Sequence, residues 1–492
     1  MRKLLLASAA TVGLVGSAVA QTAPVPTEML GVPSQPSVYL GGNNSLNSDG
    51  SALPAGPTTP TPGTMTIHMN GRVWGYFGAQ GGSSSVVSPS AAGSGSIAGG
   101  KTNPYSMEGY FRLYPGVDAL ATNGLRYGAI VEIRQNYIGQ SYGLNITAPS
   151  GTANPGAGGA NGSSPSGSSS ASTLYVRREA VYFGSDQVGI IRIGQDDGPF
   201  SQYDNGVTTF QFGTGAWNGD APAILPGNGI VVFPFWSGIG AEYAVSKAVY
   251  FSPRFAGFDI AASFAPSNTS NQSSACPVAG AGCGAVSSAV TNAFGGENRP
   301  TNWYEVMARY QGNFGGLGVY GILGYSGSGH VHVVGSVPGG IGAGGVSAPT
   351  AYNGFSVGDG GLALTYAGFT IGGNVLWGAY NGQVQLKPQG GANAVAWVGG
   401  AQYAIGPVTL AASWINYQSQ GSAVMINKSQ SYNNEFAAGV TYAVAPGLNA
   451  YAEYVYGQTH QGGVSQITGA SGTSANNDWH GQAMVIGTRV QW

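Results

Sequence analysis

The residues best suited to act together in this sequence are arginines and carboxylates, which occur in two separate groups. Side chains of opposite charge that face each other across water create a field that orients polar solutes and disfavours apolar ones. The pattern predicts a charged constriction with a basic wall formed by Arg72, Arg112, Arg126, Arg134, Arg178 and Arg192. The predicted acidic group, which follows Arg192 in a stretch without Lys or Arg up to Lys247, is Asp196, Asp197, Asp204, Asp220 and Glu242.

Alternative roles stay open for several of these charges. Each arginine could instead form a salt bridge at a rim or contact lipopolysaccharide, and Asp204 and Asp220 also suit turns because Gly and Asn lie beside them. Arg177 and Arg178 are adjacent, so on a strand they point to opposite faces unless a bulge intervenes. We therefore expect one of the two to point to a subunit interface.

The stretch 197–240, between two expected strands, is unusually apolar for a loop. A loop surrounded by water would not carry so many large apolar side chains, so we expect it to fold inward and face the basic wall. These side chains are Phe200, Phe210, Phe212, Trp217, Ile224, Leu225, Phe233, Phe235 and Trp236.

The composition indicates that something other than water covers much of the surface. Only 7% of the 492 residues are charged, against roughly 25% in an average soluble protein. After residue 20 we find no apolar run of about 20 residues, the length that a membrane-spanning helix needs. Only helices and closed barrels satisfy every backbone group in hydrocarbon, so a β-barrel is expected. A Gly-rich soluble β-solenoid is the alternative, but no fixed short repeat is found.

Alternation of apolar and polar residues with period two predicts sixteen strands and an all-β, antiparallel transmembrane barrel. The connections between these strands alternate between short turns and long loops, as in outer-membrane barrels. The expected strands are 67–79, 105–117, 124–138, 173–184, 188–196, 241–252, 257–265, 301–313, 316–327, 356–367, 369–381, 395–405, 407–418, 432–444, 448–459 and 480–492.

The N-terminal region divides into two segments before the barrel domain 65–492. Residues 1–20 have the positive end, apolar core and small-residue site of a signal peptide, with cleavage after Ala20. Residues 21–64 are rich in Pro, Ser and Thr and predict a disordered extension. Cys276 and Cys283 lie close together in an exported chain, which favours one small disulfide within a loop.

By these features the chain resembles the general porins of Gram-negative outer membranes. The resemblance is carried by the runs 175–178, 181–184 and 190–198 and by the aromatic C-terminal Trp492, where the family usually has Phe. It implies a sixteen-stranded barrel with an inward-folded third loop, commonly a homotrimer, in contact with outer-membrane lipid and lipopolysaccharide. It also implies passive diffusion of ions and small hydrophilic solutes.

Other functional classes have less support in the sequence. A substrate-selective channel, for sugars for example, would need aromatic side chains along the lumen, and a non-conducting adhesin would need no pore. We see no supported catalytic arrangement of His and Ser, no phosphate-binding or dinucleotide motif and no basic run. We therefore predict no enzyme activity, no cofactor, no metal and no nucleic-acid partner; His330 and His332 lie in a Gly-rich loop and favour solvation over metal binding.

Overall fold

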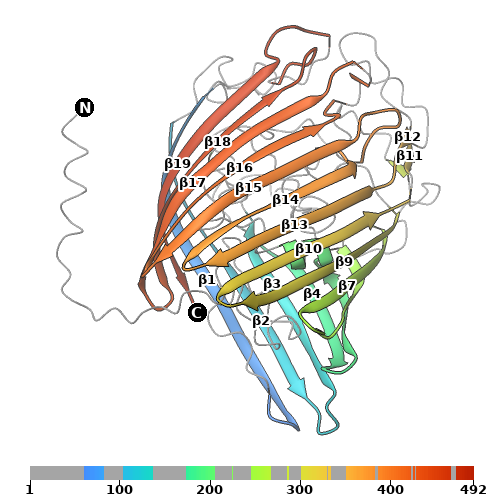
Figure 1. Ribbon diagram of the computed structural model, residues 1–492, viewed down its shortest axis with the longest axis vertical. Coiled ribbons are helices and arrows are strands. Elements are labelled where there is room, and N and C mark those ends of the chain that lie inside the picture. Colours follow the sequence, from blue (N-terminus) through green and yellow to red (C-terminus); the bar gives the residue numbers. More distant parts are fainter. Residues whose placement is uncertain are drawn as a thin grey trace, which may run out of the picture.

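The chain forms a closed barrel of sixteen antiparallel strands (Figure 1). The computed structural model describes residues 60–82, 104–136, 173–204, 224, 245–267, 285–286, 301–329, 331–333, 351–382, 386–422, 425–426, 428–466 and 472–492. The barrel strands are β1 (Thr64–Gly82), β2 (Tyr105–Leu120), β3 (Arg126–Asn136), β4 (Thr173–Ser185), β5 (Gly189–Asp196), β6 (Val245–Phe251), β7 (Phe258–Ser267), β9 (Thr301–Phe314), β10 (Leu317–Gly327), β13 (Ser356–Tyr366), β14 (Phe369–Ala379), β15 (Ala394–Ile405), β16 (Val408–Ser419), β17 (Ser431–Ala445), β18 (Leu448–His460) and β19 (Asp478–Gln491).

The barrel closes where the last strand pairs with the first. β19 runs antiparallel to β1 over eleven residue pairs, from Arg72 with Gln491 to Gly82 with Gly481. Beyond β19, the backbone N–H of Trp492 donates to the carbonyl of Gly71 at 3.0 Å. A Cβ on Gly71 would come within 2.5 Å of the Trp492 ring, so a glycine is needed where the indole crosses β1. Closure leaves no unpaired edge between the two ends of the sheet.

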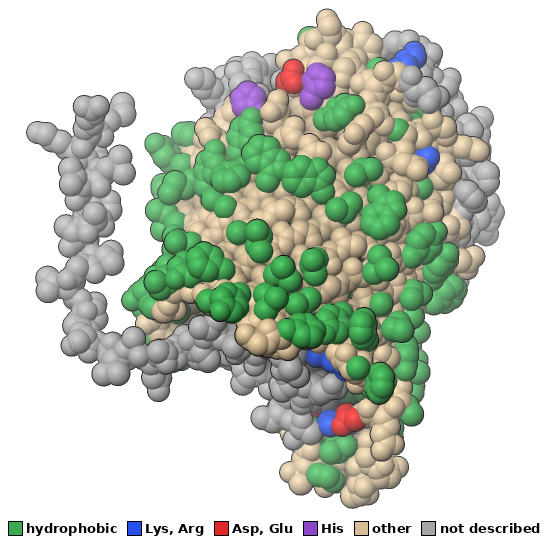
Figure 2. All heavy atoms as spheres, viewed as in Figure 1, with side chains coloured by type: hydrophobic (Ala, Val, Ile, Leu, Met, Phe, Trp, Pro, Cys, Tyr) green, Lys and Arg blue, Asp and Glu red, His purple; other side chains and the backbone are tan. Residues whose placement is uncertain are grey.

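Side chains alternate between the two faces of the wall. On β14, for example, Ile371, Val375 and Trp377 are exposed, whereas Leu376 is buried. Hydrophobic side chains spread over the outer face, and the few charged groups visible in this view lie near its edges (Figure 2). The inner positions hold most of the buried charged residues. The wall therefore has an apolar outside and a polar inside, as a barrel in lipid requires.

The sequence-based prediction of a sixteen-stranded antiparallel barrel is confirmed. All sixteen expected strands form, and the short connections alternate with long ones, as predicted. Tight turns of two residues use glycine in the left-handed region, with φ of 55° at Gly406 and 75° at Gly447. Among the described residues, no helix is long and apolar enough to cross a membrane.

Three short strands outside the barrel were not expected from the sequence. These strands are β8 (Ala285–Val286), β11 (Val331–Val333) and β12 (Ala351–Tyr352). β11 pairs with both β8 and β12, so the connection between β7 and β9 is joined to the connection between β10 and β13. Strands of two or three residues are too short to show a period-two pattern in the sequence.

Several sequence-based predictions fall outside the described residues. These are the signal peptide 1–20 with its cleavage site at Ala20, nearly all of the extension 21–64, and the expected disulfide between Cys276 and Cys283.

Candidate functional site: the charged inner wall

Three of the predicted arginines form one row across neighbouring strands. Arg72 of β1 is the Cα partner of Arg112 of β2, which is in turn the partner of Arg134 of β3. The guanidinium carbons of Arg72 and Arg112 lie 4.9 Å and 5.5 Å from the centre of the Trp74 ring. An indole face attracts cations, so Trp74 helps to hold two like charges close together.

A β-bulge places both Arg177 and Arg178 on the inner side. The pairing of β3 with β4 shifts register so that Glu132 pairs with Arg178 and Ile133 with Val176, which leaves Arg177 as the extra residue. Arg177 Nη1 donates to Glu132 Oε2 at 3.0 Å, and Arg178 Nε donates to the same oxygen at 2.6 Å. The expectation that one of these two arginines points to a subunit interface is therefore wrong, because the bulge turns both inward.

Asp196 and Asp197 pair directly with this basic wall instead of facing it across water. Arg177 binds both oxygens of Asp197, at 2.6 Å and 3.0 Å. Arg192 Nη1 donates to Asp196 Oδ2 at 3.3 Å, and Arg178 Nη1 lies 3.6 Å from Asp196 Oδ1. Together with Glu132, which also binds Arg134, these groups form one buried ion-pair network at the end of β5, where the third long loop begins.

The remaining predicted charges lie elsewhere. Arg126 sits at the start of β3 and forms two hydrogen bonds, of 2.7 Å and 2.9 Å, with Asp186 in the turn between β4 and β5. It is thus separate from the ion-pair network. Asp204 ends the short helix α2 (Pro199–Asp204), but its side chain is not among those described. Asp220 and Glu242 lie outside the described residues.

The structure also brings charged residues into the lumen that the sequence analysis did not select. The alternation of inward and outward side chains along a strand indicates these residues in the sequence. Glu305, for instance, lies between Tyr304 and Val306, which both point outward. We name as the carboxylate arc the buried acidic residues Asp259, Glu305, Asp359, Glu435 and Glu453, which lie on β7, β9, β13, β17 and β18.

The opposite side of the ring is predominantly basic. We name as the arginine arc the inner residues Arg489, Arg72, Arg112, Arg134, Arg177, Arg178 and Arg192, which lie on β19 and β1 to β5. Within this arc, seven arginines meet four buried carboxylates, Asp118 included. Among the described residues from β6 to β18, five carboxylates meet three cations: Lys247, Arg309 and, in the turn between β6 and β7, Arg254, which pairs with Asp259. β2 and β13 stand eight strands apart in either direction around the ring, so Arg112 and Asp359 belong to opposite walls (Figure 1).

The start of the third long loop is attached to the carboxylate side. The N–H of Phe200 in α2 donates to Glu305 Oε2 at 3.3 Å, and the hydroxyl of Tyr320 on β10 donates to the carbonyl of Tyr203. The guanidinium carbon of Arg309 lies 4.0 Å from the centre of the Tyr203 ring. Glu305, Arg309 and Tyr320 occupy inner positions, so α2 lies against the inner face of β9 and β10.

The part of the chain that the structure describes contains no group of three or more His, Cys, Asp or Glu residues that could hold a metal ion. Several inner charges instead pair with one another, as Arg177 does with Asp197.

Comparison with known proteins assigns the chain to a family. The family model described as Gram-negative porin matches residues 7–462. This chain belongs to the Gram-negative porins. The porin is accordingly a channel-forming β-barrel protein of the outer membrane.

The solved structures that are similar to this chain include other bacterial porins. The anion-selective porin from Comamonas acidovorans has 14% sequence identity and a TM-score of 0.48, covering 87% of this chain and 100% of that one. OmpT of Vibrio cholerae in its trimer form has 12% identity and a TM-score of 0.46, covering 87% and 100%. A mutant of the Rh. blastica porin has 11% identity and a TM-score of 0.44, with the same coverage. A comparison with curated proteins finds no match.

Proposed function

We propose that this porin forms a water-filled channel for passive diffusion of ions and small hydrophilic solutes, with a transverse field between the arginine arc and the carboxylate arc. The observation that carries the proposal is the segregation of buried inner charges between the two walls. Charges fixed at close quarters on a low-dielectric wall act strongly on a passing solute. Polar solutes would orient in this field, whereas apolar solutes would have to displace ordered water.

We also propose that the third long loop folds inward and narrows the lumen. The attachment of α2 to Glu305 and Tyr320 supports this, as does the ion-pair network that fixes Asp196 and Asp197 at the start of the loop. The constriction would then lie beside the arginine arc. Asp196 and Asp197 would moderate the positive charge of that arc, and the facing negative charge would come from the carboxylate arc.

The homotrimer and the contacts with lipid and lipopolysaccharide that the resemblance implies are part of the same proposal. An apolar outer wall on most strands supports a lipid contact. The sugar-selective alternative receives no support from the inner pair of Tyr380 and Tyr417, because both side chains are buried and their hydroxyls donate to backbone carbonyls.

Single-channel recording of the purified full chain in a planar bilayer tests this function. With a salt gradient across the bilayer, we expect discrete, ohmic conductance steps and a reversal potential that reports which charges dominate. A silent bilayer, from protein shown by its heat-dependent electrophoretic shift to be folded and by protease protection to be inserted, would contradict the channel.

A further inference from the structure

The first strand extends beyond the strand that closes the barrel. Strand pairing of β1 with β19 begins at Arg72, and below it Gly71 and Trp492 exchange two backbone hydrogen bonds of 3.0 Å. β1 itself starts earlier, at Thr64, and Figure 1 shows β1 and β2 continuing below the C-terminus. Over residues 64–70, the edge of β1 that faces away from β2 therefore has no neighbouring strand within the described part of the chain.

Three residues of this overhang direct their backbone toward the free edge. An antiparallel strand bonds its two neighbours through alternate residues, so the bonds of Gly71 to Trp492 fix the direction of every second residue before it. We name these residues, Met65, Ile67 and Met69, the open edge. Their N–H and C=O groups point away from β2 and have no hydrogen-bond partner among the described residues.

The open edge also carries apolar side chains on the outer face. Met65, Ile67 and Met69 are 59%, 79% and 61% exposed. In lipid, the backbone groups of the open edge would find no hydrogen-bond partner, whereas in water its apolar side chains would be solvated. An added strand would remove both costs, because it supplies backbone partners and covers apolar surface.

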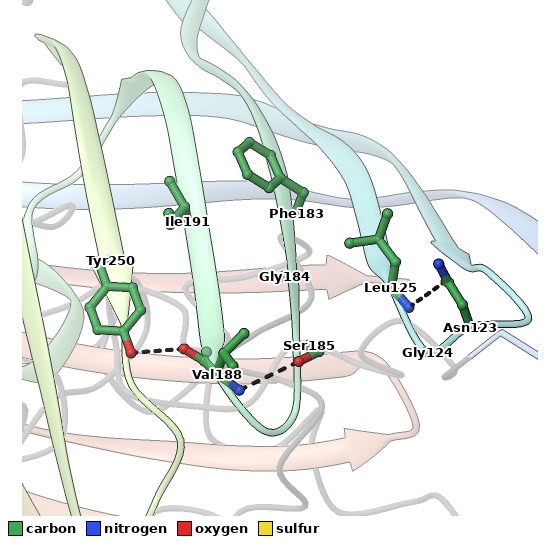
Figure 3. Close-up of a pocket in the computed structure, with 10 residues that line it drawn as sticks. Asn123, Gly124, Leu125, Phe183, Gly184, Ser185, Val188, Ile191 and Tyr250 are labelled. Carbon is green, nitrogen blue, oxygen red and sulfur yellow. Dashed lines mark hydrogen bonds between the residues drawn. The ribbon is translucent and has the colours of Figure 1, made fainter.

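The open edge lacks the features that protect exposed edges elsewhere. Charged side chains, proline and bulges commonly do so, but residues 64–70 contain no Lys, Arg, Asp, Glu or Pro and pair with β2 without a register shift. Backbone groups of two short turns are satisfied by side chains (Figure 3): the N–H of Leu125 donates to Asn123 at 3.1 Å, and the hydroxyl of Tyr250 donates to the carbonyl of Val188 at 2.8 Å. The open edge is thus suited to strand addition.

The chain enters β1 at the N-terminal end of the open edge, through a tight turn. The N–H of Thr64 donates to the carbonyl of Thr61 at 2.9 Å, and Gly63 has a φ of 84°, as a type II turn requires. The N–H of Gly63 donates to the carbonyl of Leu120 at 2.7 Å, which fixes the turn to the end of β2. Pro60, the first described residue, is buried. The residues before it are therefore tethered close to the open edge.

The nearest upstream stretch that suits a strand is 37–40. Residues 54–60 hold three prolines, which cannot donate to a ladder. Residues 41–53 are mostly Gly, Asn and Ser, which are typical of a flexible linker. Residues 37–40 read Ser-Val-Tyr-Leu, which combines residue types that favour strands with alternation of apolar positions.

We propose that residues 37–40 pair with the open edge of β1 as a short antiparallel strand. The linker 41–60 has a root-mean-square length of about 25 Å, whereas the open edge is about 14 Å long, so the linker permits this return. Leu40 would pair with Met65 and Val38 with Ile67, which places apolar side chains together on the outer face.

The tether favours this occupant over a separate molecule, because a flexibly linked segment has an effective concentration of the order of millimolar. The proposal gives part of the extension 21–64 a docking site on the barrel. It goes beyond the proposed channel function and does not depend on it, so a silent bilayer would leave it unaffected.

Amide hydrogen exchange, resolved for single residues by NMR of the purified full chain in detergent micelles, tests the proposal. The variant Val38→Pro/Leu40→Pro removes the two N–H groups that would bond to β1, so the amides of the open edge should exchange at least about tenfold faster than in the wild type. Asn44→Pro/Asn47→Pro, in the linker, is the matched control and should keep the wild-type rates. The amide of Thr66 points to β2 and should stay protected in all three proteins.

Two outcomes of this measurement would overturn the proposal. Rapid exchange of the open-edge amides in the wild type would mean that nothing covers them. Slow exchange in all three proteins would mean that something other than residues 37–40 covers them, such as a second copy of this chain.

Disulfide formation provides a test that does not depend on the folding of the proline variants. In a chain with Cys276 and Cys283 replaced by Ser, oxidation of Val38→Cys/Ile67→Cys should form a disulfide within one chain. Val38→Cys/Ile371→Cys, whose second position lies on the outer face of β14, should form none. Equal yields in the two variants, or a disulfide between chains at position 67, would contradict the proposed pairing.

Discussion

Arg178 and Glu132 are joined by a 2.6 Å hydrogen bond that crosses from β4 to β3 at the register shift between these strands. The bulge there gives Glu132 a second partner, Arg177, which in turn binds Asp197. Glu132 thus links the barrel wall to the first residues of the third long loop. The single buried carboxylate of Glu132 therefore compensates the positive charges of Arg134, Arg177 and Arg178.

Replacing Glu132 with Gln should therefore change both selectivity and stability. The loss of one buried negative charge leaves Arg134, Arg177 and Arg178 less compensated, so the anion-to-cation permeability ratio should rise. Removing one partner of a buried ion pair also costs on the order of 3 kcal/mol of unfolding free energy. The reversal potential in a KCl gradient and a urea unfolding curve measure the two effects.

The matched control for this substitution is Asp186→Asn. Asp186 also pairs with an arginine, but its side chain is 63% exposed in a turn, where an ion pair contributes about 0–1 kcal/mol. We expect little change in either measurement. If Glu132→Gln behaved like this control, Glu132 would not organise the network.

Glycine at position 128 should be required for the contact between Tyr182 and Asp118. The Tyr182 ring crosses over Gly128, and its hydroxyl donates to Asp118. A Cβ at Gly128 would lie 2.6 Å from that ring and 2.0 Å from the carbonyl of Val117. Gly128→Val should thus lower the unfolding free energy by about 1–3 kcal/mol, measured by urea unfolding in detergent.

Gly399→Val provides the control for this experiment. A Cβ at Gly399 would have no atom within 4 Å, so we expect a change of no more than about 0.5 kcal/mol. Equal losses in both variants would mean that valine perturbs the strands in general, and not the packing of Tyr182.

The sequence predicted the barrel well because side-chain direction in a strand depends only on local alternation. Parity alone was enough to count the strands and to place Arg72 and Arg112 on the inner face. It could not place Arg177, since its direction depends on a bulge that no local pattern shows. Nor could it show that Asp196 and Asp197 bind the wall directly, because these contacts depend on the register between β4 and β5.

The carboxylate arc was missed for a different reason. Its members occur singly on strands far apart in the sequence, such as Glu305 on β9 and Asp359 on β13. A search for clustered charge selects the acidic stretch after Arg192 instead. Only closure of the ring gathers these isolated carboxylates on one wall.

The hydroxyl of Tyr320 should stabilise the attachment of α2. It donates to the carbonyl of Tyr203, and Tyr320→Phe removes this hydrogen bond while keeping the ring. Loss of this hydrogen bond should destabilise the attachment of α2 by about 0.5–1.5 kcal/mol. Because we propose that the loop narrows the lumen, weaker attachment should increase the frequency of closing events in single-channel recordings. Tyr366→Phe, at an exposed outer position, should leave the recordings unchanged; identical traces for both variants would contradict the role of α2.

The field between the two arcs is tested most directly by the reversal potential of Arg72→Gln/Arg112→Gln in a KCl gradient, recorded beside the wild type and Arg126→Gln. Arg72 and Arg112 belong to the row on β1 and β2, whereas Arg126 pairs with Asp186 at the turn. We predict open channels in all three proteins, a shift toward cation selectivity in the double variant and little shift in Arg126→Gln. Open channels with the same reversal potential in the double variant and the wild type would contradict the account.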